Sequence, residues 1–145
     1  MPLQRIDRAY EVTWLVRRLF RAMGARADDY LADAGISAAD RAVMEFLYPE
    51  HELSVPEIAR SYDVSRQHVQ VTVNQLTGRG LLRSSENPNH KRSRLFRLSR
   101  LGRDSFEEIR RNESAVIENL FADISDDALA ATEETLANLL KKLEV

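Results

Sequence analysis

Apolar residues recur along the first 31 residues at the spacing of an α-helix. One stripe, with steps of three and four, consists of Val12, Leu15, Val16, Leu19, Phe20 and Met23. A second row, Ile6, Tyr10 and Trp14, recurs every four residues. We therefore predict a helix from Gln4 to about Leu31 with two apolar faces, one covering the core and the other able to meet a partner chain.

Two shorter helices are predicted next, each preceded by a serine that can cap it. Ser37 precedes a helix from Ala38 to about Tyr48, which Pro49 ends, and residues 50–53 are expected to be a connector. The sequence Ser54-Val-Pro-Glu has the pattern of a capping box and begins a helix from Pro56 to Tyr62.

A fourth helix is predicted after a tight turn at residues 63–64. Ser65 caps a segment from Arg66 to about Thr77, which has a buried seam at Val69, Val73 and Leu76. The arrangement of two short helices joined by a turn is typical of a helix-turn-helix.

Two strand-like runs follow, at residues 81–85 and 94–98. Between them, Asn87-Pro88-Asn89 has the composition of a turn, so the segment predicts a β-hairpin. Ser99 then caps a helix from Arg100 to about Phe121, and Ser125-Asp126 begins a last helix rich in leucine.

Charge is distributed unevenly along the chain. Residues 53–103 hold ten basic and three acidic side chains, whereas the rest holds 11 basic and 20 acidic ones, so a net charge of −2 conceals a basic module. A clustered positive face is typical of proteins that bind phosphate-rich partners.

Several functional classes lack support in this composition. The absence of cysteine excludes disulfides, thiol-based sensing and thiolate ligands for zinc. His51, His68 and His90 lack the spacing of a metal site, and no phosphate loop or nucleophile motif is present. The sequence shows neither a secretory signal nor an apolar run that could span a bilayer. We therefore expect a cytoplasmic non-enzyme without metal, cofactor or membrane partner.

The outer face of the fourth helix has the chemistry of a DNA-reading surface. With the seam turned inward, Gln67, Val71 and Asn74 lie opposite it, flanked by His68, Gln70 and Gln75. Gln and Asn pair bidentately with adenine, and valine contacts a thymine methyl group. The face carries no acid, and Ser65 and Arg66 stand at the helix N-terminus, where anions are favoured.

The hairpin tip, residues 87–94, is the second candidate element. It contains His90, Lys91, Arg92 and Arg94, which suits contact with phosphates or a minor groove. The alternative is that these charges serve solubility and protect the edge of the hairpin.

These segments resemble the MarR-type winged-helix regulators. Residues 65–70 and 74–82 are similar to that family's recognition helix and its exit, and residues 91–102 resemble its wing and following strand. Leu98-Ser99-x-x-Gly102 stands where the family often has Leu-Thr-x-x-Gly. His90 stands where the family frequently has an Asp that orients the wing arginine, so Arg92 is expected to be held by Asn89 or another neighbour, or to be less ordered without DNA.

The resemblance implies a mainly α fold with a small β-hairpin wing, in which a winged helix-turn-helix is flanked by long terminal helices that pair two chains. Residues 1–34 and 104–145 would dimerise, residues 35–103 would bind DNA, and all would form one compact domain. It also implies a homodimer, more often a repressor, on a pseudo-palindromic operator in double-stranded DNA, with half-sites roughly 10 bp apart.

Many relatives in that family release DNA when a small aromatic acid or phenol binds in a cleft. The candidate lining residues here are Trp14, Arg17, Arg18, Met44, Phe46 and Tyr48. The competing interpretation is that the aromatic residues belong to the core and the arginines are solvated. At the level of the whole chain, the alternative to a regulator is a winged-helix module whose basic face binds an acidic protein.

Overall fold

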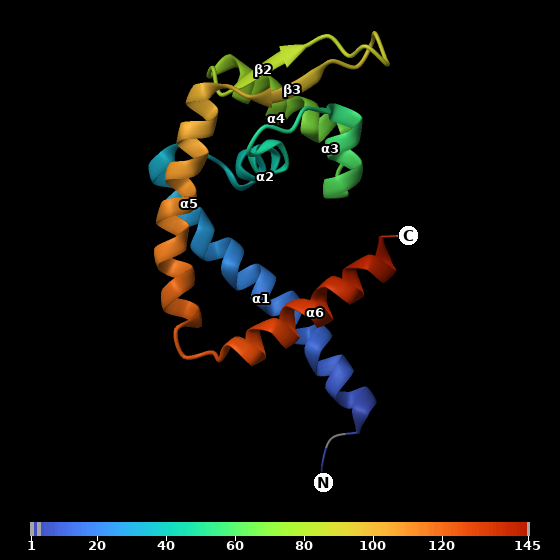
Figure 1. Cartoon of the computed structure of the whole chain (residues 1–145), viewed down its shortest axis with the longest axis vertical. Coiled ribbons are helices and arrows are strands. Elements are labelled where there is room, and N and C mark those ends of the chain that lie inside the picture. Colours follow the sequence, from blue (N-terminus) through green and yellow to red (C-terminus); the bar gives the residue numbers. More distant parts are fainter. Residues whose placement is uncertain (1, 3, 145) are drawn as a thin grey trace. The chain divides into compact units, whose positions relative to one another are not determined.

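The computed structural model describes residue 2 and residues 4–144. The chain divides into two compact units, one within residues 1–110 and one within residues 111–145. Across these described residues it forms six α-helices and three short β-strands (Figure 1). Their bounds are α1 Arg5–Ala34, α2 Ala38–Leu47, β1 Leu53–Ser54, α3 Val55–Tyr62, α4 Arg66–Gly78, β2 Leu82–Ser85, β3 Leu95–Leu98, α5 Arg100–Phe121 and α6 Asp126–Leu143. The predicted mainly helical fold with a hairpin wing is confirmed.

The predicted helix ends agree closely with those observed, and their caps explain why. Ser37 and Ser54 each form a capping box with the acid three residues later, Asp40 and Glu57. The first helix continues three residues beyond the predicted Leu31, to Ala34. It ends there because Gly35 adopts the left-handed conformation (φ 66°), which glycine tolerates without steric cost.

The predicted connector at residues 50–53 is wrong at its last residue. Leu53 and Ser54 form strand β1, which pairs antiparallel with β3 through Leu53 opposite Phe96 and Ser54 opposite Leu95. The three-stranded sheet therefore has the order β1-β3-β2. Two residues are too few to show the alternating pattern of a strand, so β1 is recognised only by its hydrogen-bonded pairing with β3.

The core of the first unit lies where α2, α3, α4 and the sheet meet (Figure 1). Its most completely buried side chains come from five helices: Leu31, Val43, Met44, Leu47, Ile58, Val69, Val73, Leu76 and Phe106. The three seam residues predicted for α4 are all 0% exposed. Because the seam is fixed in the core, the opposite face of α4 is held toward solvent.

A serine and a glycine join the start of α5 to the exit of α4. The backbone N–H of Ser99 donates to the carbonyl of Leu81 (3.0 Å), and the Ser99 hydroxyl donates to the carbonyl of Gly80 (2.5 Å). The same hydroxyl accepts the N–H of Gly102 (3.0 Å). A Cβ atom at Gly102 would lie 2.0 Å from the carbonyl oxygen of Leu81, so only glycine fits this approach. The Leu-Ser-x-x-Gly motif therefore holds the start of α5 against the exit of α4, at the base of the wing.

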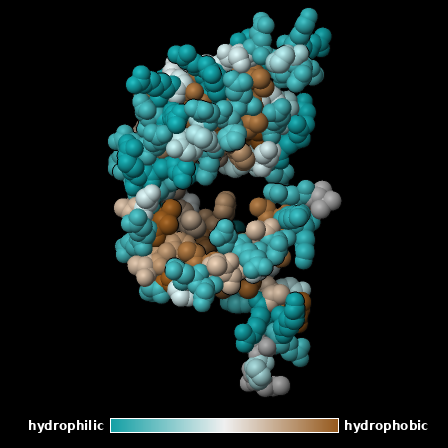
Figure 2. All heavy atoms as spheres, viewed as in Figure 1, coloured by the Kyte–Doolittle hydropathy of each residue, from teal (hydrophilic) through white to brown (hydrophobic). Residues whose placement is uncertain are grey.

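The terminal helices expose apolar side chains. Every described residue of α1 before Ala27 is exposed, and α6 has no buried residue. Figure 2 shows a mainly hydrophilic surface over the winged helix and apolar side chains at the surface of the terminal helices. Of the helices described, none is long and apolar enough to cross a membrane.

Candidate nucleic-acid interface

Helix α4 is positioned by its cap and by the turn before it. Asp63 ends α3 in the left-handed conformation (φ 55°), which turns the chain sharply toward Ser65. The Ser65 hydroxyl accepts the backbone N–H of His68 (3.0 Å), as predicted for the N-cap. Thr72, a buried residue that the apolar pattern did not single out, donates its hydroxyl to the His68 carbonyl (3.2 Å).

The predicted outer face of α4 is exposed. Its members are Ser65, Arg66, Gln67, His68, Gln70, Val71, Asn74 and Gln75. Val71 is 52% exposed, which is unusual for an aliphatic residue on a helix whose other valines are fully buried. Gln70 Nε2 donates to Asn74 Oδ1 (2.9 Å), so two of the predicted base-reading side chains are joined.

A groove brings the two predicted elements together. It has a volume of about 400 Å³ and runs between the start of α3, the first turns of α4 and the wing. Its lining includes Arg66, Gln67 and Gln70 from α4, and Arg92 and Arg94 from the wing, with Pro56 and Phe96 as apolar walls. Residues separated by more than 20 positions in sequence thus share one surface. The apolar walls were not predicted, because they depend on how α3 and β3 pack.

The wing arginines differ in how they are held. Arg94 Nε donates to the Ser84 hydroxyl across the hairpin (3.2 Å). Arg92 makes no hydrogen bond or ion pair with any described residue. The expectation that Asn89 or another neighbour holds its side chain is therefore wrong. Instead, the backbone N–H of Asn89 donates to Asn87 Oδ1 (3.0 Å), which shapes the turn. The Arg92 guanidinium therefore has all of its donors available for a partner.

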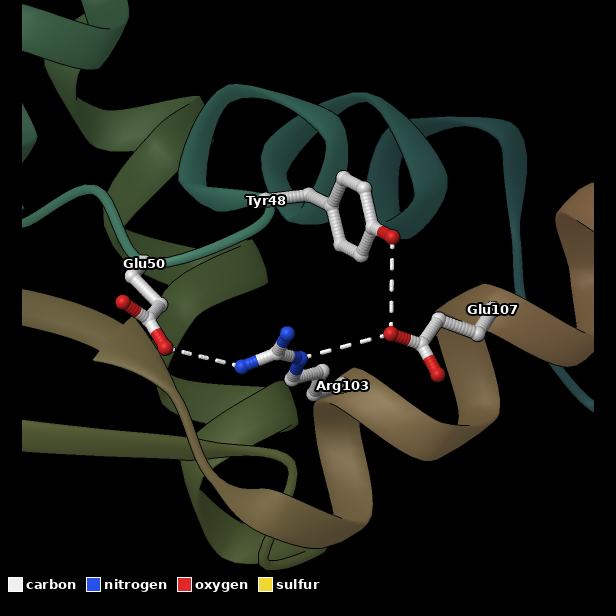
Figure 3. Close-up of polar contacts among 4 residues, drawn as sticks. All are labelled: Tyr48, Glu50, Arg103 and Glu107. Atoms are coloured by element: carbon white, nitrogen blue, oxygen red, sulfur yellow. Dashed lines mark hydrogen bonds and ion pairs between the residues drawn. The ribbon is translucent and has the colours of Figure 1, made fainter.

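Other arginines of the basic segment are already engaged within the protein. Arg103 pairs with Glu50 (2.9 Å) and Glu107 (3.3 Å), and the Tyr48 hydroxyl donates to the same Glu107 oxygen (3.4 Å; Figure 3). The hydrogen bonds that Arg103 donates to Glu107 and then to Glu50 raise the pKa of its guanidinium above the usual value. The Arg97 guanidinium lies 3.9 Å from the Glu52 carboxylate.

The positive charge is therefore divided between two roles. Arg97 and Arg103 lie beside acids of the protein itself, which offset their charge. Arg66, Lys91 and Arg92 have no acidic partner among the described residues, and Arg66 and Arg92 line the groove beside the outer face of α4. An uncompensated charge at that position attracts a polyanion more strongly than the local net charge alone indicates.

The candidate effector residues are not brought into one site within this chain. Met44 is 0% exposed in the core. Phe46 packs edge-on against Tyr62, and Tyr48 packs against Phe106. Trp14, Arg17 and Arg18 lie exposed on α1, where the Arg18 guanidinium is 5.7 Å from the Trp14 ring centre. For Met44, Phe46 and Tyr48, the core interpretation is favoured.

Comparison with known proteins agrees with this geometry. Residues 34–93 match the model of the MarR family. The chain is a MarR-type winged-helix protein. The match spans the helix-turn-helix, strand β2 and the hairpin tip as far as Ser93, and it ends before the groove residues Arg94 and Phe96.

Solved structures extend the MarR-type likeness to nearly the whole chain. The structure of the MarR family transcription regulator SP03579 is 22% identical and covers 95% of this chain and 91% of its own, with a TM-score of 0.82. The transcriptional regulator BldR from Sulfolobus solfataricus is 20% identical, covering 97% and 98%, with a TM-score of 0.81. A mutant MarR from E. coli complexed with operator DNA is 19% identical, covering 95% and 99%, with a TM-score of 0.77.

A curated relative is an uncharacterised protein of Mycobacterium tuberculosis, Rv2011c. It is 35% identical over 96 residues, which are 66% of this chain and 66% of the relative. The family and the fold are those of DNA-binding transcription regulators rather than of enzymes.

Proposed function

We propose that this MarR-type protein is a homodimeric transcription regulator, acting as a repressor, that binds a pseudo-palindromic operator through one α4 helix per half-site. The observation that carries the proposal is the groove shared by α4 and the wing. It combines uncharged amide side chains, which suit base edges, with cations that have no internal partner.

The residues of this surface are assigned to two tasks. Gln67, Gln70, Val71 and Asn74 contact bases in the major groove, with His68 and Gln75 at the flanks. Ser65 and Arg66 bind phosphate at the start of α4, where the free amides and the helix dipole favour an anion. Lys91, Arg92 and Arg94 bind phosphates or enter the minor groove.

The proposed dimer is supported by the exposed apolar surface of the terminal helices. Trp14 and Phe20 on α1 are 52% and 79% exposed, and Leu140 and Leu143 on α6 are 56% and 82% exposed. Burying apolar surface is worth roughly 25 cal/mol per Å². A second copy that covers residues 1–34 and 104–145 would remove this surface from water. The resulting two-fold axis would place two α4 helices about 10 bp apart.

A small aromatic acid or phenol is the proposed effector. The exposed Trp14 ring and the Arg18 guanidinium beside it provide an aromatic surface and a cation, which together suit an aromatic anion. Arg17 lies exposed at the next position on α1.

Paired substitutions test the assignment of base contacts and phosphate contacts. Arg92→Ala removes one phosphate contact per protomer, so the log–log salt slope of a dimer should flatten by about 1.8 and affinity should fall on every duplex. Gln67→Ala should mainly reduce the preference for the operator over a random duplex. The matched control is Arg97→Ala, which removes an exposed arginine that already lies beside Glu52 and should change neither quantity.

Two outcomes would contradict these assignments. An unchanged salt slope for Arg92→Ala would show that this arginine does not meet phosphate. An equal loss on operator and random duplexes for Gln67→Ala would remove Gln67 from base reading. If the wild type binds only weakly and without sequence preference, the protein is a non-specific DNA binder or a module whose basic face binds an acidic protein.

A further inference from the structure

The hydrogen bond between Gln70 and Asn74 restricts which base Gln70 can read. The two residues stand one turn apart on the exposed face of α4, and Gln70 Nε2 donates to Asn74 Oδ1 at 2.9 Å. An amide nitrogen carries two N–H groups and an amide oxygen has two lone pairs. Gln70 therefore keeps one N–H donor and its Oε1 acceptor, while its rotation about the last side-chain bond is fixed by Asn74.

This remaining pair of groups matches adenine and does not match guanine. In the major groove adenine offers the N7 acceptor and the N6 amino donor, whereas guanine offers two acceptors, N7 and O6. With Nε2 held by Asn74, Oε1 of Gln70 would oppose guanine O6. To read guanine, Gln70 would have to reverse its amide, and the bond to Asn74 would then survive only if the Asn74 amide reversed as well.

The neighbouring residues favour the same kind of base pair. Val71 follows Gln70 and is 52% exposed, so its methyl groups are available for the methyl group of thymine. Residues 67–75 contain neither arginine nor lysine, the side chains that most often read guanine. The cations of this surface stand at the start of α4 and on the wing instead.

We propose that Gln70 is the adenine-reading residue, that Asn74 is a positioning residue which holds the Gln70 amide, and that each half-site therefore has an A·T pair under Gln70 and a thymine methyl group against Val71. This inference rests on the proposed function, because it specifies the DNA that the same surface binds. It also changes the role of Asn74 from a base contact to a support for its neighbour.

The test uses the full-length protein and a duplex selected by the wild type from a random pool. Each adenine of one half-site is replaced in turn by 7-deazaadenine, which lacks the N7 acceptor. The adenine whose replacement weakens the wild type but not Gln70→Ala is assigned to Gln70. At that position the wild type should lose affinity about tenfold, which corresponds to one good base contact. Replacing the adjoining thymine by uracil should weaken the wild type but not Val71→Ala.

The role of Asn74 is tested by the ratio of the affinities for A and for G at the assigned position, measured within each variant. A general loss of affinity cancels in this ratio. In Asn74→Ala the preference for A over G at the assigned position should fall to less than half of the wild-type ratio, while affinity for a random duplex should stay within twofold. Asn74→Asp keeps an acceptor oxygen for Gln70 and should restore the ratio, although its added charge lowers affinity on all DNA. Gly78→Ala, a helical position at the end of α4 with open space around its Cβ and outside the base-reading face, is the control and should keep the wild-type ratio.

Three results would overturn the inference while leaving the proposed function intact. These are a selected half-site with guanine under Gln70, a wild type indifferent to every 7-deazaadenine, or an unchanged ratio in Asn74→Ala. A wild type that selects no duplex at all would instead refute the proposed function, and this inference with it.

Discussion

Gly102 offers a sharp test of the packing that positions the wing, because two opposing effects act there and the structure decides which is larger. In an open helix position, alanine is favoured over glycine by about 0.5–1 kcal/mol. At Gly102, however, the added Cβ would lie 2.0 Å from the Leu81 carbonyl oxygen and 2.9 Å from its carbon. These are backbone atoms, so the contact cannot be relieved by moving a flexible side chain.

The loss of stability expected for Gly102→Ala follows from the movement of α5 away from Leu81. Overpacking in a well-packed site typically costs about 1–3 kcal/mol. Moving α5 away from Leu81 also stretches the hydrogen bond from Ser99 N–H to that carbonyl, at a cost of about 1 kcal/mol. Subtracting the helix gain leaves Gly102→Ala less stable by about 1–3 kcal/mol.

Urea unfolding at one fixed protein concentration measures this change. With an m-value of about 2 kcal/mol per M, a loss of about 2 kcal/mol lowers the midpoint by about 1 M at unchanged m. Gly78→Ala is the matched control, because Gly78 is helical and has open space around its Cβ position. That variant should be as stable as the wild type or slightly more so. If Gly102→Ala were equally stable, the close contact between α5 and the exit of α4 would not exist in solution.

Two further predictions concern the dimer and the effector. Leu140→Glu places a charge on the exposed apolar face of α6 and should convert the homodimer to a monomer in sedimentation, whereas a variant that still sediments as a dimer would exclude this face from the interface. Trp14 is the single tryptophan of the chain, so benzoate binding beside it should change the intrinsic fluorescence saturably. Arg18→Ala should weaken that response, and a wild type with no saturable response would remove Trp14 from the effector site.

Much of the fold could be predicted from local signals, because each signal acts over one or two helical turns. The seam of α4 follows from a rotation of 100° per residue, and Val69, Val73 and Leu76 are all fully buried as predicted. The capping boxes at Ser37 and Ser54 act within four residues. The sequence predicts the box at Ser54 but not the one at Ser37, because the usual partner three residues after the cap is Glu or Gln rather than Asp.

The features that were missed depend on contacts between distant segments. Strand β1 is defined by its pairing with β3, some 40 residues later. The bond from Arg94 to Ser84 needs the hairpin register, which the composition of the turn does not fix. The predicted effector residues differ in how deeply they are buried, which the sequence pattern does not indicate. Helical spacing shows which side chains share a face but not how deep they lie, so Met44 in the core and Trp14 at the surface looked equivalent.

Selection of duplexes from a random pool tests whether the surface shared by α4 and the wing reads DNA sequence. The selected duplexes are then bound at 50 and 200 mM salt. We expect an enriched inverted repeat with half-sites about one helical turn apart and an affinity that falls steeply with salt. A weak, salt-sensitive affinity without any enriched sequence would refute sequence reading and leave a non-specific DNA binder or a protein-interaction module.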